Sequence, residues 1–96
     1  MSPNKLKKLI ILRKKLDKLD NSLISLIKRR TEIVKEVLKL KTYKNQIVDK
    51  KRISAILKNI KKKSIKNNID TKITNRIWKN MIWAYIDYER RRFKKK

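Results

Sequence analysis

Residues 12–41 read LRKKLDKLDNSLISLIKRRTEIVKEVLKLK, with leucine, isoleucine and valine recurring at steps of three and four residues. These steps match the period of an α-helix whose apolar residues share one side. Neither proline nor glycine interrupts residues 5–41. We therefore predict one uninterrupted helix over residues 5–41, roughly 55 Å long at 1.5 Å per residue.

A helix of that length exceeds the size of the rest of its own chain. A globule of this chain length has a radius of gyration of only about 13 Å. The apolar stripe of the long helix therefore needs a partner, and a second copy of the same chain supplies one. The prediction is an all-α fold that forms an intertwined homodimer.

The remainder of the chain predicts two further helices. TYKNQIV (42–48) breaks the period and is expected to be a loop. Asp49 is a suitable N-cap for a short helix over residues 49–63, and SIKNNI (64–69) is expected to be a polar connection. Asp70 then caps a third helix of intermediate length, which is followed by a basic tail. Residues 1–96 are thus expected to form a single helical domain.

Composition excludes several classes of chemistry. The chain has no cysteine, no histidine and no glycine. Thiol nucleophiles, histidine acid–base relays, soft-metal sites and glycine-rich phosphate loops are therefore excluded, and neither a metal nor a cofactor is predicted. No apolar run approaches the roughly 20 residues of a membrane span, and the N-terminus is not a convincing export signal. We expect a cytoplasmic protein.

The net charge of +23 has two interpretations. A nucleic-acid-binding module would use the cations and the aromatic side chains near the basic C-terminal tail, such as Trp78 and Trp83. The cations are instead spread along the whole chain, as expected when a composition is rich in lysine, isoleucine and asparagine throughout. Compositional bias is therefore the preferred explanation, and nucleic-acid binding that persists at physiological salt would favour the other.

Three cations of the long helix form a candidate anion site. Arg30 and Lys41 are eleven positions apart, which at about 100° per residue places them within about 20° of each other around a helix. Two such side chains can hold an anion between them, although both could equally lie on a solvated face. Arg13 is about 100° away around the helix, so it could serve this site only from the partner chain of an antiparallel dimer.

Glu89 is unusual because it continues the apolar stripe of the third helix. Ile82, Tyr85 and Ile86 precede it on the same side. A chain with so many cations has no shortage of polar residues for its outer faces. The position of this carboxyl group therefore needs a functional explanation or an ion-pair partner, such as Arg92 at i+3.

These segments together resemble a known enzyme family. Residues 12–41 are similar to the opening helix of the all-helical chorismate mutases, with an L-R-x-x-[IL]-D-x-[IL]-D start, an R-R pair and a later lysine. The resemblance continues through IVDKKRISAIL (47–57), NNID (67–70) and MIWAYIDYE (81–89). It implies a three-helix intertwined dimer in which each active site takes one arginine from the other chain.

The implied reaction is the Claisen rearrangement of chorismate to prephenate in aromatic amino-acid biosynthesis, without a cofactor. Lys41 and Glu89 would hydrogen-bond the ether oxygen of the breaking C–O bond. Arg30 and the partner's Arg13 would bind the two substrate carboxylates. The implied site residues are catalytic Lys41 and Glu89, and substrate-binding Arg13, Arg30, Asp49 and Arg52, the last two near the ring end of chorismate.

The resemblance suggests why a carboxyl group lies on the stripe. The ether oxygen gains negative charge in the transition state, so the site needs hydrogen-bond donors and no base. A carboxylate would repel that oxygen, whereas a carboxylic acid would donate to it. Burial favours the neutral form of Glu89 and the nearby cations favour the charged one. Our hypothesis is that Glu89 acts while protonated.

Two positions depart from the commonest mutase pattern. Ile53 stands where many members carry a glutamate, and Tyr85 stands where serine or threonine is frequent. Both are similar to the isochorismate-pyruvate lyase subgroup, which makes salicylate. Glu89 favours the mutases, because those lyases use glutamine there. The prediction is a chorismate mutase, with the lyase as the alternative; whether a further shikimate-pathway protein binds stays open.

Overall fold

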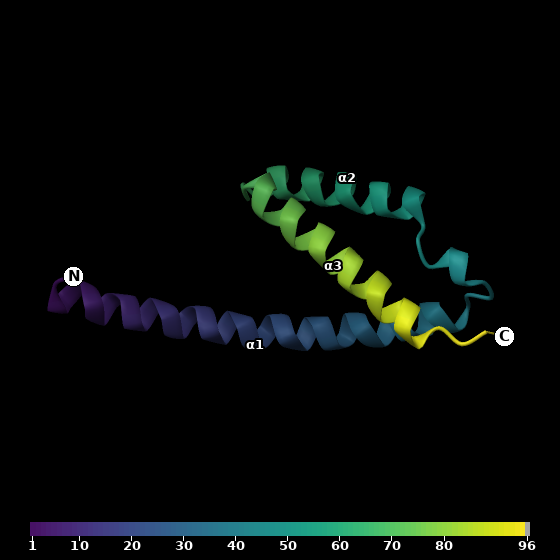
Figure 1. Ribbon diagram of the computed structural model, residues 1–96. Helices are drawn as coiled ribbons and strands as arrows, with labels where there is room; N and C mark the ends of the chain where they lie inside the picture. The colour runs from purple at the N-terminus through teal and green to yellow at the C-terminus, as the bar shows by residue number, and fades with distance from the viewer. Residues whose placement is uncertain (96) are drawn as a thin grey trace. The chain divides into compact units, whose positions relative to one another are not determined.

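The computed structural model describes residues 1–95 (Figure 1). These residues contain α1 (Pro3–Lys39), a short 3-10 helix η1 (Lys44–Gln46), α2 (Lys50–Lys66) and α3 (Thr71–Arg92), and no strand. The predicted all-α fold of one long, one short and one intermediate helix is confirmed. The chain divides into two compact units, Met1–Ile33 and the part from Val34 onward, which are described separately below.

The first unit consists of the N-terminal part of α1. The helix begins at Pro3, two residues before the predicted start, because proline suits the first helical position, where its missing N–H is not needed. Ser2 assists there, since its Oγ accepts from the Lys5 amide at 3.3 Å. The apolar stripe is exposed, with Leu16 at 58%, Leu19 at 61% and Leu23 at 54% exposure. Such a contiguous exposed stripe is typical of a surface that another polypeptide covers.

The second unit starts with the last residues of α1, which end at Lys39 and not at Lys41. The amides of Leu40 and Lys41 donate to the carbonyls of Val37 and Leu38, each at 3.1 Å. These bonds span three residues, so the last turn tightens and the helix stops. Lys41 therefore follows α1, and the prediction that this helix extends to residue 41 is wrong by two residues.

The predicted loop of residues 42–48 contains η1 and part of the core. The side chain of Gln46 organises it, because its Oε1 accepts from the amides of Thr42 and Tyr43, each at 2.8 Å. Ile47 follows and is only 4% exposed. The loop is thus fixed at one end by a side-chain hydrogen-bond acceptor and at the other by a buried apolar anchor.

The start of α2 is as predicted, and its end is not. Asp49 is the N-cap, and its Oδ1 accepts from the Arg52 amide at 3.0 Å. The helix continues to Lys66, three residues past the predicted end. Ser64 does not break it because its hydroxyl donates back to the Ile60 carbonyl at 2.6 Å. The polar composition of residues 64–69 therefore wrongly predicted that the link between the two helices begins at residue 64.

A short turn joins α2 to α3, and the two helices form a hairpin (Figure 1). Asn68 in this turn has a φ of 56°, a left-handed conformation that asparagine tolerates better than most residues. Asp70 is the predicted N-cap of α3, and its Oδ1 accepts from the Lys72 amide at 2.8 Å. Between the helices Ser64 Oγ is hydrogen-bonded to Thr74 Oγ1 at 2.7 Å, and both residues are buried.

The core of the second unit is small. Ile47, Ile82 and Ile86 are its buried apolar residues, and further apolar side chains pack against them: Leu38, Val48, Ile53, Ile56, Leu57 and Phe93. So small a core is marginal for a folded domain, which supports the expectation that burial continues in an assembly. Within residues 1–95 no helix is long and apolar enough to cross a membrane.

Candidate active site

Lys41 and Glu89 meet in the second unit although 48 positions separate them in the sequence. Lys41 Nζ lies 2.7 Å from Glu89 Oε2, a hydrogen-bonded ion pair. The pair is largely withdrawn from solvent, with 18% of the lysine side chain and 10% of the glutamate side chain exposed. Charge-assisted hydrogen bonds of this length are among the stronger polar contacts in proteins.

The position of Glu89 follows from the period of α3. Ile86 and Ile82, one and two turns earlier on the same side of the helix, are buried in the core. Glu89 therefore lies on the buried side of α3, where a carboxyl group needs a hydrogen-bond or ion-pair partner. That partner is Lys41 and not Arg92, whose guanidinium lies 4.9 Å from the centre of the Tyr88 ring.

Lys41 also opens onto a hollow of about 630 Å³ at the start of α2. The lining residues are Lys41, Gln46, Val48, Asp49, Lys50 and Lys51. This volume is within the range of sites that bind small molecules. The hollow has more cations than carboxylates in its lining, which suits an anionic ligand.

The structure brings Asp49 and Arg52 together at the same end of α2. The Asp49 side chain caps the helix by accepting from the Arg52 amide, so its negative charge serves a structural purpose. Arg52 lies in the first turn of α2 and is exposed. Sequence reasoning did not identify Gln46, because a residue that organises a loop through its side chain carries no periodic signal.

Arg13 and Arg30 belong to the first unit, where both lie on α1. Arg13 is exposed. Both therefore stay predicted members of the site, to be tested by experiment. Their spacing of seventeen residues along one continuous helix is now established.

The two positions that depart from the mutase pattern both have structural contacts. Ile53 packs against the core of the second unit. Tyr85 lies edge-on to Tyr88, with 6.4 Å between the ring centroids and 80° between the planes. An isoleucine in this place cannot hydrogen-bond a substrate hydroxyl, so any such contact must come from elsewhere.

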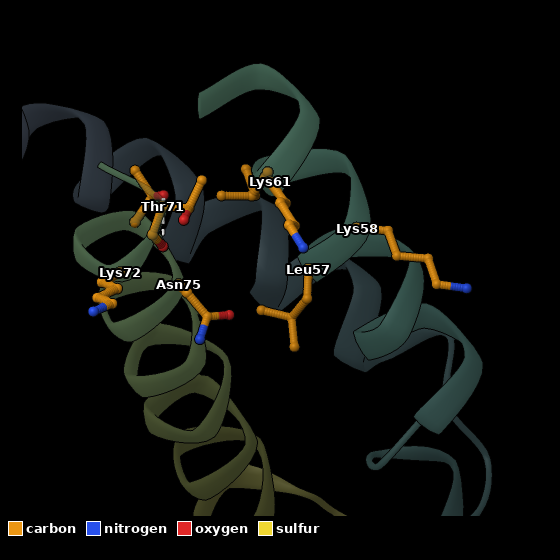
Figure 2. A pocket seen from close by; sticks show the side chains of 8 residues that line it. Leu57, Lys58, Lys61, Thr71, Lys72 and Asn75 are labelled. Atoms are coloured by element: carbon orange, nitrogen blue, oxygen red, sulfur yellow. Dashed lines mark hydrogen bonds between the residues drawn. The ribbon is translucent and has the colours of Figure 1, made fainter. Parts of the chain in front are cut away.

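A second hollow of about 340 Å³ lies between α2 and α3 (Figure 2). Three lysines are among its lining residues, yet Figure 2 shows the amino groups of Lys58 and Lys72 pointing outwards. Lys61 and Asn75 extend toward the space between the helices. None of the six predicted site residues lines it. The hollow at Lys41 is therefore the better candidate for the active site.

Comparison with known proteins gives one match. The family model described as chorismate mutase type II matches residues 12–90. The matched span includes Arg13, Arg30, Lys41 and Glu89, together with α2 and all of α3 except its last two residues. No curated protein and no solved structure matches significantly.

Proposed function

The chain belongs to the chorismate mutase type II family, and we propose that it catalyses the rearrangement of chorismate to prephenate. The family is one of isomerases. Membership does not distinguish the mutase reaction from that of the related lyases, so the choice between them depends on the site. The observation that supports the mutase best is the Lys41–Glu89 pair, held at 2.7 Å beside an open hollow.

The reaction demands charge stabilisation and no group transfer. Within one molecule the ether C–O bond of chorismate breaks while a C–C bond forms between the enolpyruvyl methylene carbon and the ring. No nucleophile attacks and no proton moves. Negative charge grows on the ether oxygen, so donors fixed near that oxygen lower the barrier.

Lys41 meets this requirement. Its ammonium group is held by Glu89 before any substrate binds, so it needs little reorganisation when charge develops. Only 18% of its side chain is exposed, and electrostatic interactions strengthen as water is excluded. We assign Lys41 as the donor to the ether oxygen.

Glu89 gives the first prediction, which concerns pH. A carboxylate beside the ether oxygen would repel the growing charge, whereas a carboxylic acid would donate a hydrogen bond to it. If the protonated form reacts, kcat/KM falls as the pH rises and Glu89 loses its proton. Glu89→Gln cannot ionise, so its kcat/KM should stay flat across the same range. Rates of both proteins over a series of buffers at constant ionic strength provide the measurement.

The pH profile of Glu89→Gln decides whether Glu89 acts as the proton-bearing donor. An unchanged fall in Glu89→Gln would mean that another group titrates and that Glu89 is not the proton-bearing donor. Circular dichroism at each pH controls for unfolding, because loss of the Lys41 partner could alter stability as well as rate.

The carboxylates of chorismate are assigned to arginines on α1. Arg30 would bind one and the partner's Arg13 the other, in a homodimer whose interface includes the exposed leucines of the first unit. Arginine suits this role because its planar guanidinium donates two parallel hydrogen bonds to a carboxylate. At the ring end, Arg52 and Asp49 lie at the start of α2, beside the hollow.

A direct assay separates the mutase from the lyase. Ile53 and Tyr85 favour the lyase subgroup, whereas Glu89 favours the mutase. We expect purified protein to convert chorismate to prephenate at least about 100-fold more efficiently, in kcat/KM, than it converts isochorismate to salicylate and pyruvate. Absorbance follows chorismate loss and fluorescence follows salicylate. Faster formation of salicylate would reverse the assignment.

A further inference from the structure

A third hollow, of about 440 Å³, lies in the second unit between the ends of α1 and α3. We call it the C-terminal pocket. Its lining residues are Lys35, Leu38, Lys39, Tyr88, Arg92, Phe93, Lys94 and Lys95. It shares no lining residue with the hollow at Lys41, and its volume is within the range of small-molecule sites.

The C-terminal pocket is more basic than the composition of the chain explains. Lysine and arginine make up 31 of 96 residues, so about two or three would be expected among eight lining residues. Five are present, and no carboxylate lines the pocket. Lys39 is paired with Glu36 at 3.2 Å, but both side chains are mostly exposed, and such a pair is weak enough to be displaced.

The floor of the pocket is apolar and fixed in place. Leu38 and Phe93 both pack against the core of the second unit, so each has one side in the core and another at the pocket. The Tyr88 ring completes the floor, and the Arg92 guanidinium lies 4.9 Å from its centre in a cation–π contact. A fixed apolar floor with cations around it suits a ligand that is apolar at one end and anionic at the other.

Tyr88 is anchored beside the pocket. Its hydroxyl is buried, and among the described residues it has no hydrogen-bond partner. A buried oxygen is out of reach of a ligand in the pocket, so only the ring of Tyr88 contributes to the site.

Helix termini account for only part of the charge. Lys39 and Arg92 lie in the last turns of α1 and α3, where cations interact favourably with the helix dipole. Lys35 is one turn earlier, and Lys94 and Lys95 follow α3. The dipole also gives no reason for the apolar floor.

We propose that the C-terminal pocket binds a small aryl oxyanion, an aromatic ring carrying a phosphate or carboxylate group, at a site separate from the active site. The ring lies on Leu38, Tyr88 and Phe93. The acidic group is held by the surrounding cations, chiefly Lys35 and Arg92.

Three probes test the two halves of this ligand: phenyl phosphate, inorganic phosphate and benzyl alcohol. Each is titrated into ¹⁵N-labelled protein at physiological ionic strength, and amide shifts are followed by NMR. We expect phenyl phosphate to shift Lys35, Leu38, Tyr88 and Phe93 saturably, with at least about 10-fold higher affinity than either other probe. Equal binding of inorganic phosphate, or shifts centred on Lys41 and Asp49, would overturn the proposal.

A charge-matched pair of double variants gives the second test. Lys35→Gln with Arg92→Gln should weaken phenyl phosphate binding about 10-fold or more. Lys58→Gln with Arg76→Gln removes the same charge from exposed positions on α2 and α3, and should weaken it less than about 2-fold. Equal weakening by both would show attraction to net charge alone and would contradict a built site.

Lys41→Ala tests whether this pocket is separate from the active site. Lys41→Ala should bind phenyl phosphate as tightly as the unmodified protein, because Lys41 does not line the C-terminal pocket. Weaker binding would place the ligand at the active site. The result does not depend on whether Lys41 has the catalytic role assigned to it.

Discussion

Lys41→Ala is expected to lower kcat/KM for chorismate by about 10³-fold, the scale seen when one donor to a developing oxyanion is removed. The loss should fall mainly on kcat, because the ether oxygen carries far more negative charge in the transition state than in the ground state. The same change leaves Glu89 buried without a partner. Its side chain belongs to a residue that is 8% exposed, and the hydrogen bond to Lys41 is the one that the structure defines for it. Steady-state kinetics with chorismate provide the measurement.

Two controls separate catalysis from folding. Lys79→Ala removes one positive charge from an exposed position of α3, ten residues before Glu89, and should leave kcat/KM within about 2-fold. The double variant Lys41→Ala with Glu89→Gln removes the stranded carboxylate, so it should recover stability without recovering rate. A Lys41→Ala protein that is folded and within about 10-fold of full activity would disprove the assigned role.

Local sequence was sufficient to predict how many helices form and where two of them begin. Asp49 and Asp70 accept from backbone amides within their own first turns, so the information lies within three residues. Helix ends were predicted less well. Residues after Lys39 stop being helical through a tightened last turn, and Ser64 stays helical because its hydroxyl is satisfied by Ile60 and Thr74. Neither the tightened last turn nor the hydrogen bonds of Ser64 can be predicted from the amino-acid composition of these segments.

The candidate site shows a similar division. The period of α3 predicts that Glu89 faces inwards, yet nothing local identifies Lys41 as its partner, since 48 residues separate them. The family resemblance implied only that both residues lie at one site, around the ether oxygen of the substrate. It could not supply Gln46, which organises the loop beside Lys41, or the C-terminal pocket, whose residues come from two helix ends and a tail. Such features depend on tertiary contacts that no periodic pattern records.

Mixing two inactive variants is expected to restore activity. Arg13→Ala and Arg30→Ala should each lose about 10³-fold or more in kcat/KM, since each leaves one substrate carboxylate without its bidentate partner. If Arg13 acts across chains, a hybrid dimer has one site in which both arginines are intact and one in which both are lost. Random exchange makes half of the dimers hybrid, so about a quarter of wild-type activity should return.

The control for this experiment is a chain carrying both substitutions. Mixed with Arg30→Ala, it forms hybrids in which no site has both arginines, and activity should stay at the level of the variants alone. Exchange is verified by native mass spectrometry of differently tagged chains. Hybrids that form without any recovery would show that Arg13 does not complete the site of the other chain. The exposed leucines at positions 16, 19 and 23 would then need another explanation, because the long helix would have no catalytic reason to cross between chains.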